Sequence, residues 1–145
     1  TQRSIKMTDA LQQKIHIELL DLLDDVKFEL TELNAQKGLY INGPANQLLK
    51  RGVHMAYVQG QKQAIDNIMT IVEQQLEDQH FLEHYDKFQN EVAHRNYDKT
   101  ANFAELSDIP RQFDNFLDQF YQIKGQYFII THINTLIGDF HSEAH

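Results

Sequence analysis

The sequence predicts an all-α protein, an antiparallel helical bundle of three long helices plus one shorter helix. Apolar residues recur every three or four positions over most of the 145 residues, and only two prolines and six glycines interrupt them. With 41% hydrophobic residues, a chain of this length can bury enough surface for one core. We therefore expect a single helical-bundle domain over residues 1–145, with 1–7 flexible and 96–109 a loop.

The first helix is expected between Thr8-Asp9, which suit an N-cap and first turn, and Gly38, which suits a C-terminal cap. Its apolar stripe has spacings of three and four residues and consists of Leu11, Ile15, Leu19, Leu22, Val26, Leu30 and Leu33. Leu20, Leu23 and Phe28 widen this apolar face. The width predicts that the helix packs against more than one neighbour.

The second helix is expected after Asn42-Gly43-Pro44, with Pro44 in its first turn. Its apolar stripe consists of Leu49, Val53, Ala56, Gly60, Ala64, Ile68 and Ile71. Small residues recur within it every four positions, and we call Gly52, Ala56, Gly60 and Ala64 the small-residue stripe. Each mid-helix glycine costs about 1 kcal/mol relative to alanine. The stripe therefore predicts the close approach of another backbone, from this chain or from a second copy.

A third, shorter helix is expected over residues 78–95, either continuing the second helix with a kink or folding back against it. Its apolar face consists of Phe81, Tyr85, Phe88 and Val92. Ser107 or Asp108 then caps a last helix, whose stripe is Phe116, Phe120, Ile123, Tyr127, Ile130, Asn134, Ile137 and His141. Residues 127–133 alone resemble a strand, but the helical spacing on both sides favours a helix. No internal repeat is evident.

Composition excludes several classes of function. The formal net charge is −8, which argues against direct binding of nucleic acid or of anionic lipid by bulk electrostatics. The chain has no cysteine, so disulfides and thiolate chemistry are excluded. No secretory signal is visible, and the longest uncharged apolar-rich stretch, Gly125 to Gly138, is too short and polar to span a membrane. A soluble protein, cytoplasmic or virion-associated, is expected.

Histidines raise the alternative of a metal-binding bundle, with candidate ligands Glu77, His80, His84, Glu91 and His94. Glu-x-x-His pairs supply metal ligands in di-iron helical bundles, and two histidines four residues apart can form half of a zinc site. The two Glu-x-x-His pairs lie 14 residues apart, or about 21 Å on an unbroken helix. They can share a metal only if the chain turns between them. Exposed or hydrogen-bonded histidines are the expected alternative.

The first helix also carries Glu18, Asp21, Asp25, Glu29 and Glu32 on one face, which we call the acidic stripe. Like charges four residues apart destabilise an isolated helix. The stripe therefore fits a basic partner, or an acidic decoy that occupies a nucleic-acid-binding protein by mimicking a phosphate backbone. The other interpretation is a solvated face that keeps the protein soluble.

Signatures of catalysis are missing. The chain has no phosphate-binding glycine-rich loop and no G-x-S-x-G elbow. Its aromatic residues follow the helical spacing, which is typical of a core. We therefore expect no catalytic residue, no cofactor and a non-enzymatic function.

Residues Leu48 to Val72 contain Tyr57, Gly60, Gln61, Ala64, Ile65 and Ile68. This spacing resembles a helix pattern common in small helical proteins of tailed bacteriophages. The resemblance implies a virion, assembly or accessory protein and transfers no catalytic residue. The combined prediction is a helical protein–protein interaction or assembly module, which docks a protein partner through its helix faces and self-associates through the small-residue stripe.

Overall fold

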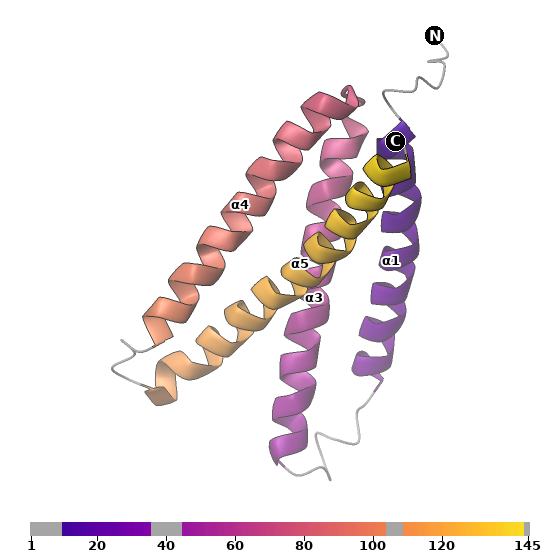
Figure 1. Cartoon of the computed structure of the whole chain (residues 1–145). Helices are drawn as coiled ribbons and strands as arrows, with labels where there is room; N and C mark the ends of the chain where they lie inside the picture. The colour runs from indigo at the N-terminus through magenta and orange to yellow at the C-terminus, as the bar shows by residue number, and fades with distance from the viewer. Residues whose placement is uncertain (1–9, 36–44, 104–108, 144–145) are drawn as a thin grey trace.

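The computed structural model of the chain describes residues 10–35, 45–103 and 109–143. These residues form four helices and no strand (Figure 1). The helices are α1 (Ala10–Asn34), α3 (Ala45–Glu73), α4 (Asp78–Phe103) and α5 (Ile109–Glu143). The prediction of an all-α protein is confirmed, and residues 127–133 are helical. The flexible segment expected over 1–7 lies outside the described residues.

The third helix is longer than predicted. α4 has 26 residues and α1 has 25, so the expected single shorter helix over 78–95 is wrong. The loop expected over 96–109 is also wrong at both ends, because α4 continues through 96–103 and α5 begins at Ile109. The polar residues of this stretch favour a loop. Residues 96–109 contain no glycine or proline, however, so nothing in their composition forces the helix to end. Residues 104–108 are outside the described part.

The chain reverses direction between α3 and α4. Gln75 has a φ of 57°, the left-handed conformation that ends many helices, and its N–H donates to the carbonyl of Val72 at 3.1 Å. Figure 1 shows α4 running back from the end of α3 and diverging from it. Residues 78–95 therefore fold back and do not continue the second helix.

The core lies around α3, with α1 and α4 on opposite sides and α5 crossing over it (Figure 1). Its fully buried side chains come from all four helices and include Leu11, Ile15, Leu19, Val26, Val58, Ile65, Ile68, Phe81, Tyr85, Ile129, Ile130 and Ile133. Leu23 packs at its edge. Leu20 and Phe28 are 45% and 66% exposed, so the apolar face of α1 is narrower than predicted.

Two glycines bring α3 and α5 into backbone contact. A β-carbon on Gly60 would lie 1.8 Å from the carbonyl oxygen of Gln122, and one on Gly125 would lie 1.9 Å from that of Tyr57. Both distances are far below van der Waals contact, so only glycine permits this crossing. The backbone that approaches Gly60 belongs to the same chain.

Tyr85 joins α4 to α5 inside the core. Its hydroxyl lies 2.7 Å from Oδ1 of Asn134 and 3.1 Å from the carbonyl oxygen of Ile130. Asn134 in turn donates to Oε1 of Gln89 at 2.6 Å. Burial raises the pKa of Tyr85, and the nearby carboxylate of Asp86 adds to the effect.

Tyr85→Phe is expected to lower the free energy of unfolding at pH 8 by about 1 kcal/mol, because Asn134 loses its donor. This difference should shrink above about pH 10, where tyrosine ionises in the unfolded chain. The raised pKa keeps Tyr85 protonated in the folded state, so the wild type loses about 1.4 kcal/mol of stability by pH 11 through this residue. Urea denaturation at pH 8, 9.5 and 11 measures both effects. A stability difference between wild type and variant that stays constant over this pH range would contradict a protonated Tyr85 hydroxyl in the folded state.

Candidate interaction surface

An open groove of about 680 Å³ runs between α1 and α5. Lys14 and Glu18 of α1 form one wall, and Tyr57 of α3 also lines the groove. The other wall is α5, with Lys124, Tyr127, Phe128, Thr131, His132, Thr135, Leu136, Asp139, Phe140 and Glu143. A smaller hollow of about 400 Å³ lies beside it and shares Tyr57. We call the larger hollow the α1–α5 groove.

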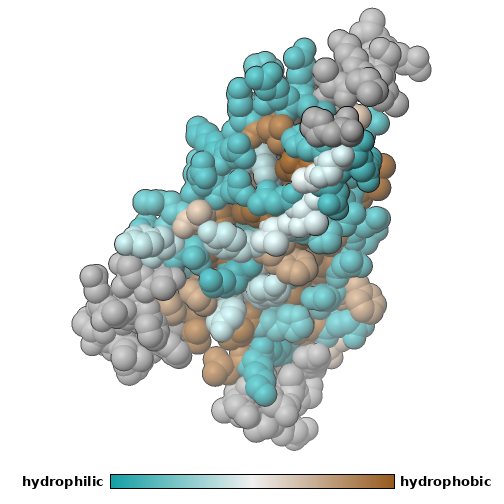
Figure 2. Space-filling model, in the orientation of Figure 1, coloured by the Kyte–Doolittle hydropathy of each residue, from teal (hydrophilic) through white to brown (hydrophobic). Residues whose placement is uncertain are grey.

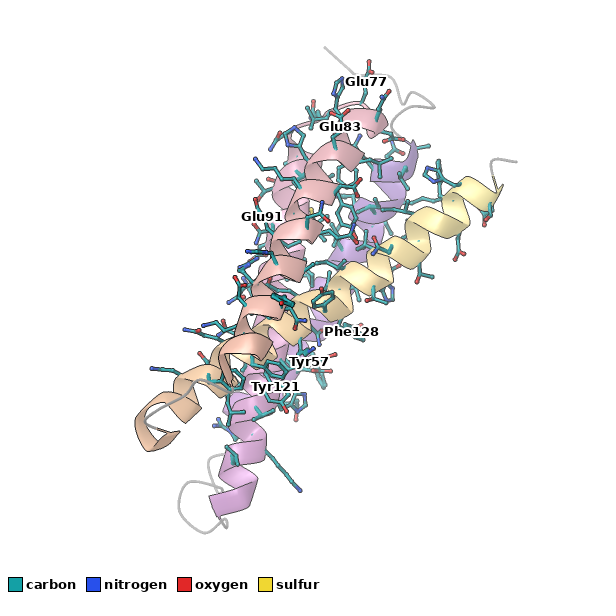
Figure 3. The ribbon with its side chains drawn as sticks, turned by 60° about the vertical axis from the view of Figure 1, so that its left-hand side comes forward. Tyr57, Glu77, Glu83, Glu91, Tyr121 and Phe128 are labelled. Carbon is teal, nitrogen blue, oxygen red and sulfur yellow. The ribbon has the colours of Figure 1, made fainter. Side chains whose placement is uncertain are left out.

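Aromatic side chains give the groove an apolar lining. The rings of Tyr57 and Phe128 meet edge to face with centroids 6.1 Å apart, and Phe128 is 44% exposed. Figure 3 shows Tyr57, Tyr121 and Phe128 gathered where α5 passes over α3. Burial raises the pKa of Tyr57, and the negative charge of Glu29 raises it further. On the face seen in Figure 2, hydrophobic residues are exposed in separate patches between hydrophilic residues.

Ion pairs cross the groove between its two walls. His132 Nε2 lies 2.7 Å from Oε1 of Glu18, and Lys14 Nζ lies 3.3 Å from Oε2 of Glu143. Lys14 also lies 5.5 Å from the centroid of the Phe140 ring, within cation–π range. His132 is thus exposed, and its ring contacts the carboxylate of Glu18.

The acidic stripe lies along α1 beside this groove. Glu18 pairs with His132, and Glu29 lies 3.4 Å from Nε2 of His54 on α3. Asp21, Asp25 and Glu32 are exposed and have no ion-pair partner among the described residues. The outer face of α1 also exposes Ile17, Leu20 and Phe28. Carboxylates and large apolar side chains therefore share the solvent-facing side of this helix.

The small-residue stripe is divided between buried and open positions. Ala56 and Ala64 are buried in α3, and Gly60 is covered by α5. Gly52 is exposed, and a β-carbon there would meet nothing within 4 Å. A second chain cannot reach Gly60 unless α5 moves, so self-association at the stripe stays a prediction for its Gly52 end.

The metal-ligand candidates do not converge. His80, His84, Glu91 and His94 lie along the single helix α4 and Glu77 just before it, and Figure 3 shows Glu77 and Glu91 far apart along this helix. The chain turns before Asp78 and not between the two Glu-x-x-His pairs. No group of three histidine, aspartate or glutamate residues in the described part could hold a metal ion. The condition for a shared metal site is therefore not met, and His80 and His94 instead pair with Glu83 and Asp98.

The chain matches no protein-family model, and no curated protein or solved structure is significantly similar to it. Within the described residues, no helix is long and apolar enough to cross a membrane.

Three features of this surface were missed from the sequence. Gly125 is the partner of Gly60 at the helix crossing. Each of these glycines is followed by glutamine, and this shared Gly-Gln dipeptide could have indicated the pair. Phe128 lies outside the apolar stripe predicted for the last helix, and it lines the groove. The pairing of His132 with Glu18 joins residues 114 positions apart, and no local pattern reveals such a contact.

Proposed function

We propose that the chain is a non-enzymatic protein–protein interaction or assembly module that acts by helix-face docking. The observation that carries this proposal is the outer face of α1, where exposed apolar side chains and carboxylates without ion-pair partners in the described part occur together. Ile17, Leu20 and Phe28 would lose water on docking, and the carboxylates would select the partner by charge. We further propose that the helices form an antiparallel bundle, which fixes this face in one orientation.

Assembly is the proposed context. The resemblance of residues 48–72 to small helical proteins of tailed bacteriophages supports a virion or accessory role. Self-association is tested by native mass spectrometry of the untagged protein. A multimer supports an assembly role, and a monomer rejects self-association while leaving partner docking in place.

Charge reversal on α1 tests the docking face. The variant Asp21→Lys, Asp25→Lys and Glu32→Lys changes only exposed side chains, so its thermal melting should resemble that of the wild type. Its matched control is Glu83→Lys, Asp86→Lys and Glu91→Lys, which makes the same charge change on exposed positions of α4. Both variants and the wild type are immobilised, and the proteins each retains from a lysate of the source organism are quantified by mass spectrometry.

We expect proteins that the wild type and the α4 variant retain and the α1 variant loses by at least tenfold. Equal retention by all three proteins would contradict the proposal. The acidic decoy is the second candidate, because Glu18, Asp21 and Asp25 continue one negative face along α1. It requires that the retained proteins bind nucleic acid and that a DNA or RNA oligonucleotide displaces them.

A further inference from the structure

Short segments of α3 and α5 are similar in sequence. Residues 58–72 of α3 and 123–137 of α5 align with a shift of 65 positions, and five of the fifteen pairs are identical. The identical pairs are Gly60 and Gly125, Gln61 and Gln126, Ile65 and Ile130, Ile68 and Ile133, and Thr70 and Thr135. This similarity is confined to fifteen residues of each helix.

Contacts at the helix crossing obey the same shift. Gly60 meets the backbone of Gln122, and Gly125 meets the backbone of Tyr57. Each of these contacts becomes the other when α3 and α5 exchange roles. The hydroxyls of Thr70 and Thr135 also make equivalent bonds, each to the carbonyl four residues earlier. The crossing therefore has an approximate twofold symmetry.

The helices that precede α3 and α5 share this symmetry. With a shift of 66 positions, the fully buried side chains of Ile15, Leu19 and Val26 in α1 correspond to those of Phe81, Tyr85 and Val92 in α4. Burial also follows the shift along α3 and α5, where 64, 65 and 68 correspond to 129, 130 and 133, all buried. The hairpin of α1 and α3 thus resembles the hairpin of α4 and α5, and residues 58–73 of α3 correspond to 123–138 of α5.

The counterparts of the groove aromatics are polar. Tyr57 corresponds to Gln122, Phe128 to Gln63 and Tyr127 to Lys62. Phe140 has no counterpart in α3, because that helix ends at Glu73. The same place in the fold therefore tolerates polar side chains, so packing alone does not require aromatic ones in the α1–α5 groove.

The acidic stripe is one-sided in the same way. Its counterparts on α4 are His84, Lys87, Glu91, Arg95 and Asp98. They are exposed and carry mixed charges, so solubility at this place in the fold does not require five carboxylates. The acidic stripe and the aromatic groove both belong to the α1–α5 side.

We infer that the α1–α5 groove and the acidic stripe together form a docking site for a basic amphipathic helix of a partner protein. This inference rests on the proposed interaction function. The aromatic side chains Phe128 and Tyr57 bind the apolar face of that helix along the α5 side of the groove. Its lysines or arginines face Asp21 and Asp25, which are exposed on α1. The groove follows α5 from Lys124 to Glu143, about 28 Å, which is long enough for several turns of a bound helix.

The probe is a fluorescein-labelled peptide of 18 residues, roughly five helical turns, containing only leucine and lysine in an amphipathic order. A peptide of the same composition in scrambled order and one with glutamate for lysine are the controls. Fluorescence anisotropy measures their affinity for the full chain. The wild type is expected to bind the amphipathic leucine–lysine peptide at least tenfold more tightly than either control. Equal binding of the scrambled peptide would overturn the inference.

The residue test compares Phe128→Gln, which installs the residue of the other half, with Tyr97→Gln. Tyr97 is an exposed aromatic residue of α4 outside the groove. We expect Phe128→Gln to weaken peptide binding at least tenfold and Tyr97→Gln to leave it unchanged, with wild-type melting for both. If only charge reversal on α1 weakens binding, the groove is not the site, although the interaction module stands. If the lysate experiment fails and peptide binding follows this pattern, the interaction function fails and the groove binds only the synthetic peptide.

Discussion

Gly60→Ala and Gly125→Ala are each expected to lower the free energy of unfolding by at least about 3 kcal/mol, or about 10 °C in melting temperature. The added β-carbon would lie 1.8 or 1.9 Å from a carbonyl oxygen of the opposite helix. Backbone atoms cannot move aside as the end of a flexible side chain can, so α3 and α5 must separate. Separation exposes the buried side chains on both sides of the crossing, and Gly60→Leu should be more damaging still.

Gly52→Ala is the matched control, because it makes the same change in the same helix. A β-carbon at Gly52 meets nothing within 4 Å, and alanine is the better helix former, so this variant should gain up to about 1 kcal/mol. Thermal melting by circular dichroism compares the three variants with the wild type. Wild-type melting of Gly60→Ala would mean that the two backbones are not in contact.

Asp78→Ala is expected to lower the free energy of unfolding by about 2 to 3 kcal/mol. Asp78 begins α4, and its carboxylate also accepts the N–H of Leu11 at 3.2 Å and the side-chain amide of Gln12 at 2.9 Å. One side chain therefore satisfies donors at the beginning of α1 while lying at the N-terminus of α4. Gln12 is only 5% exposed, so its amide would be left with the carbonyl of Leu76 as its remaining partner.

Asp78→Asn keeps one side-chain acceptor and should recover part of the loss. Asp86→Ala is the control, since Asp86 is an exposed acidic residue of the same helix. Urea denaturation measures the stability of all three variants, and hydrogen exchange at Leu11 reports the first turn of α1. If Asp78→Ala and Asp86→Ala unfold at the same urea concentration, the hydrogen bonds from Leu11 and Gln12 to Asp78 contribute nothing to stability.

Local patterns predicted the helices, because helical spacing depends only on neighbours in the chain. The stripe from Leu11 to Leu33 and the small-residue stripe lie in helices as expected, and Gly60 does meet another backbone. The error over 96–103 has the opposite cause. Those residues have a loop-like composition, yet they continue a helix whose earlier turns are fixed by Phe81, Tyr85 and Val92 in the core.

The candidate site was less predictable, because it is made by contacts between distant segments. The acidic stripe could be recognised from the sequence, since its members share one helix face. The groove beside it could not, because Phe128 and Tyr57 come from different helices and only the crossing of α3 and α5 brings them together. The metal candidates were the opposite case. The spacing within each Glu-x-x-His pair is that of a metal site, but the pair that begins at Glu77 and the pair that ends at His94 are separated along α4.

The crossing of Gly60 and Gly125 can form only after both helices have been synthesised. Gly60 leaves the ribosome 65 residues before its partner, an interval of about 3 to 13 s at ordinary elongation rates. During that interval the surface of α3 around Gly60 is not covered by α5. The second hairpin of a neighbouring chain carries the same Gly125 and presents the same contact to that surface. We therefore expect slower elongation through 75–125 to increase any exchange of hairpins between neighbouring chains, which native mass spectrometry would detect as a dimer.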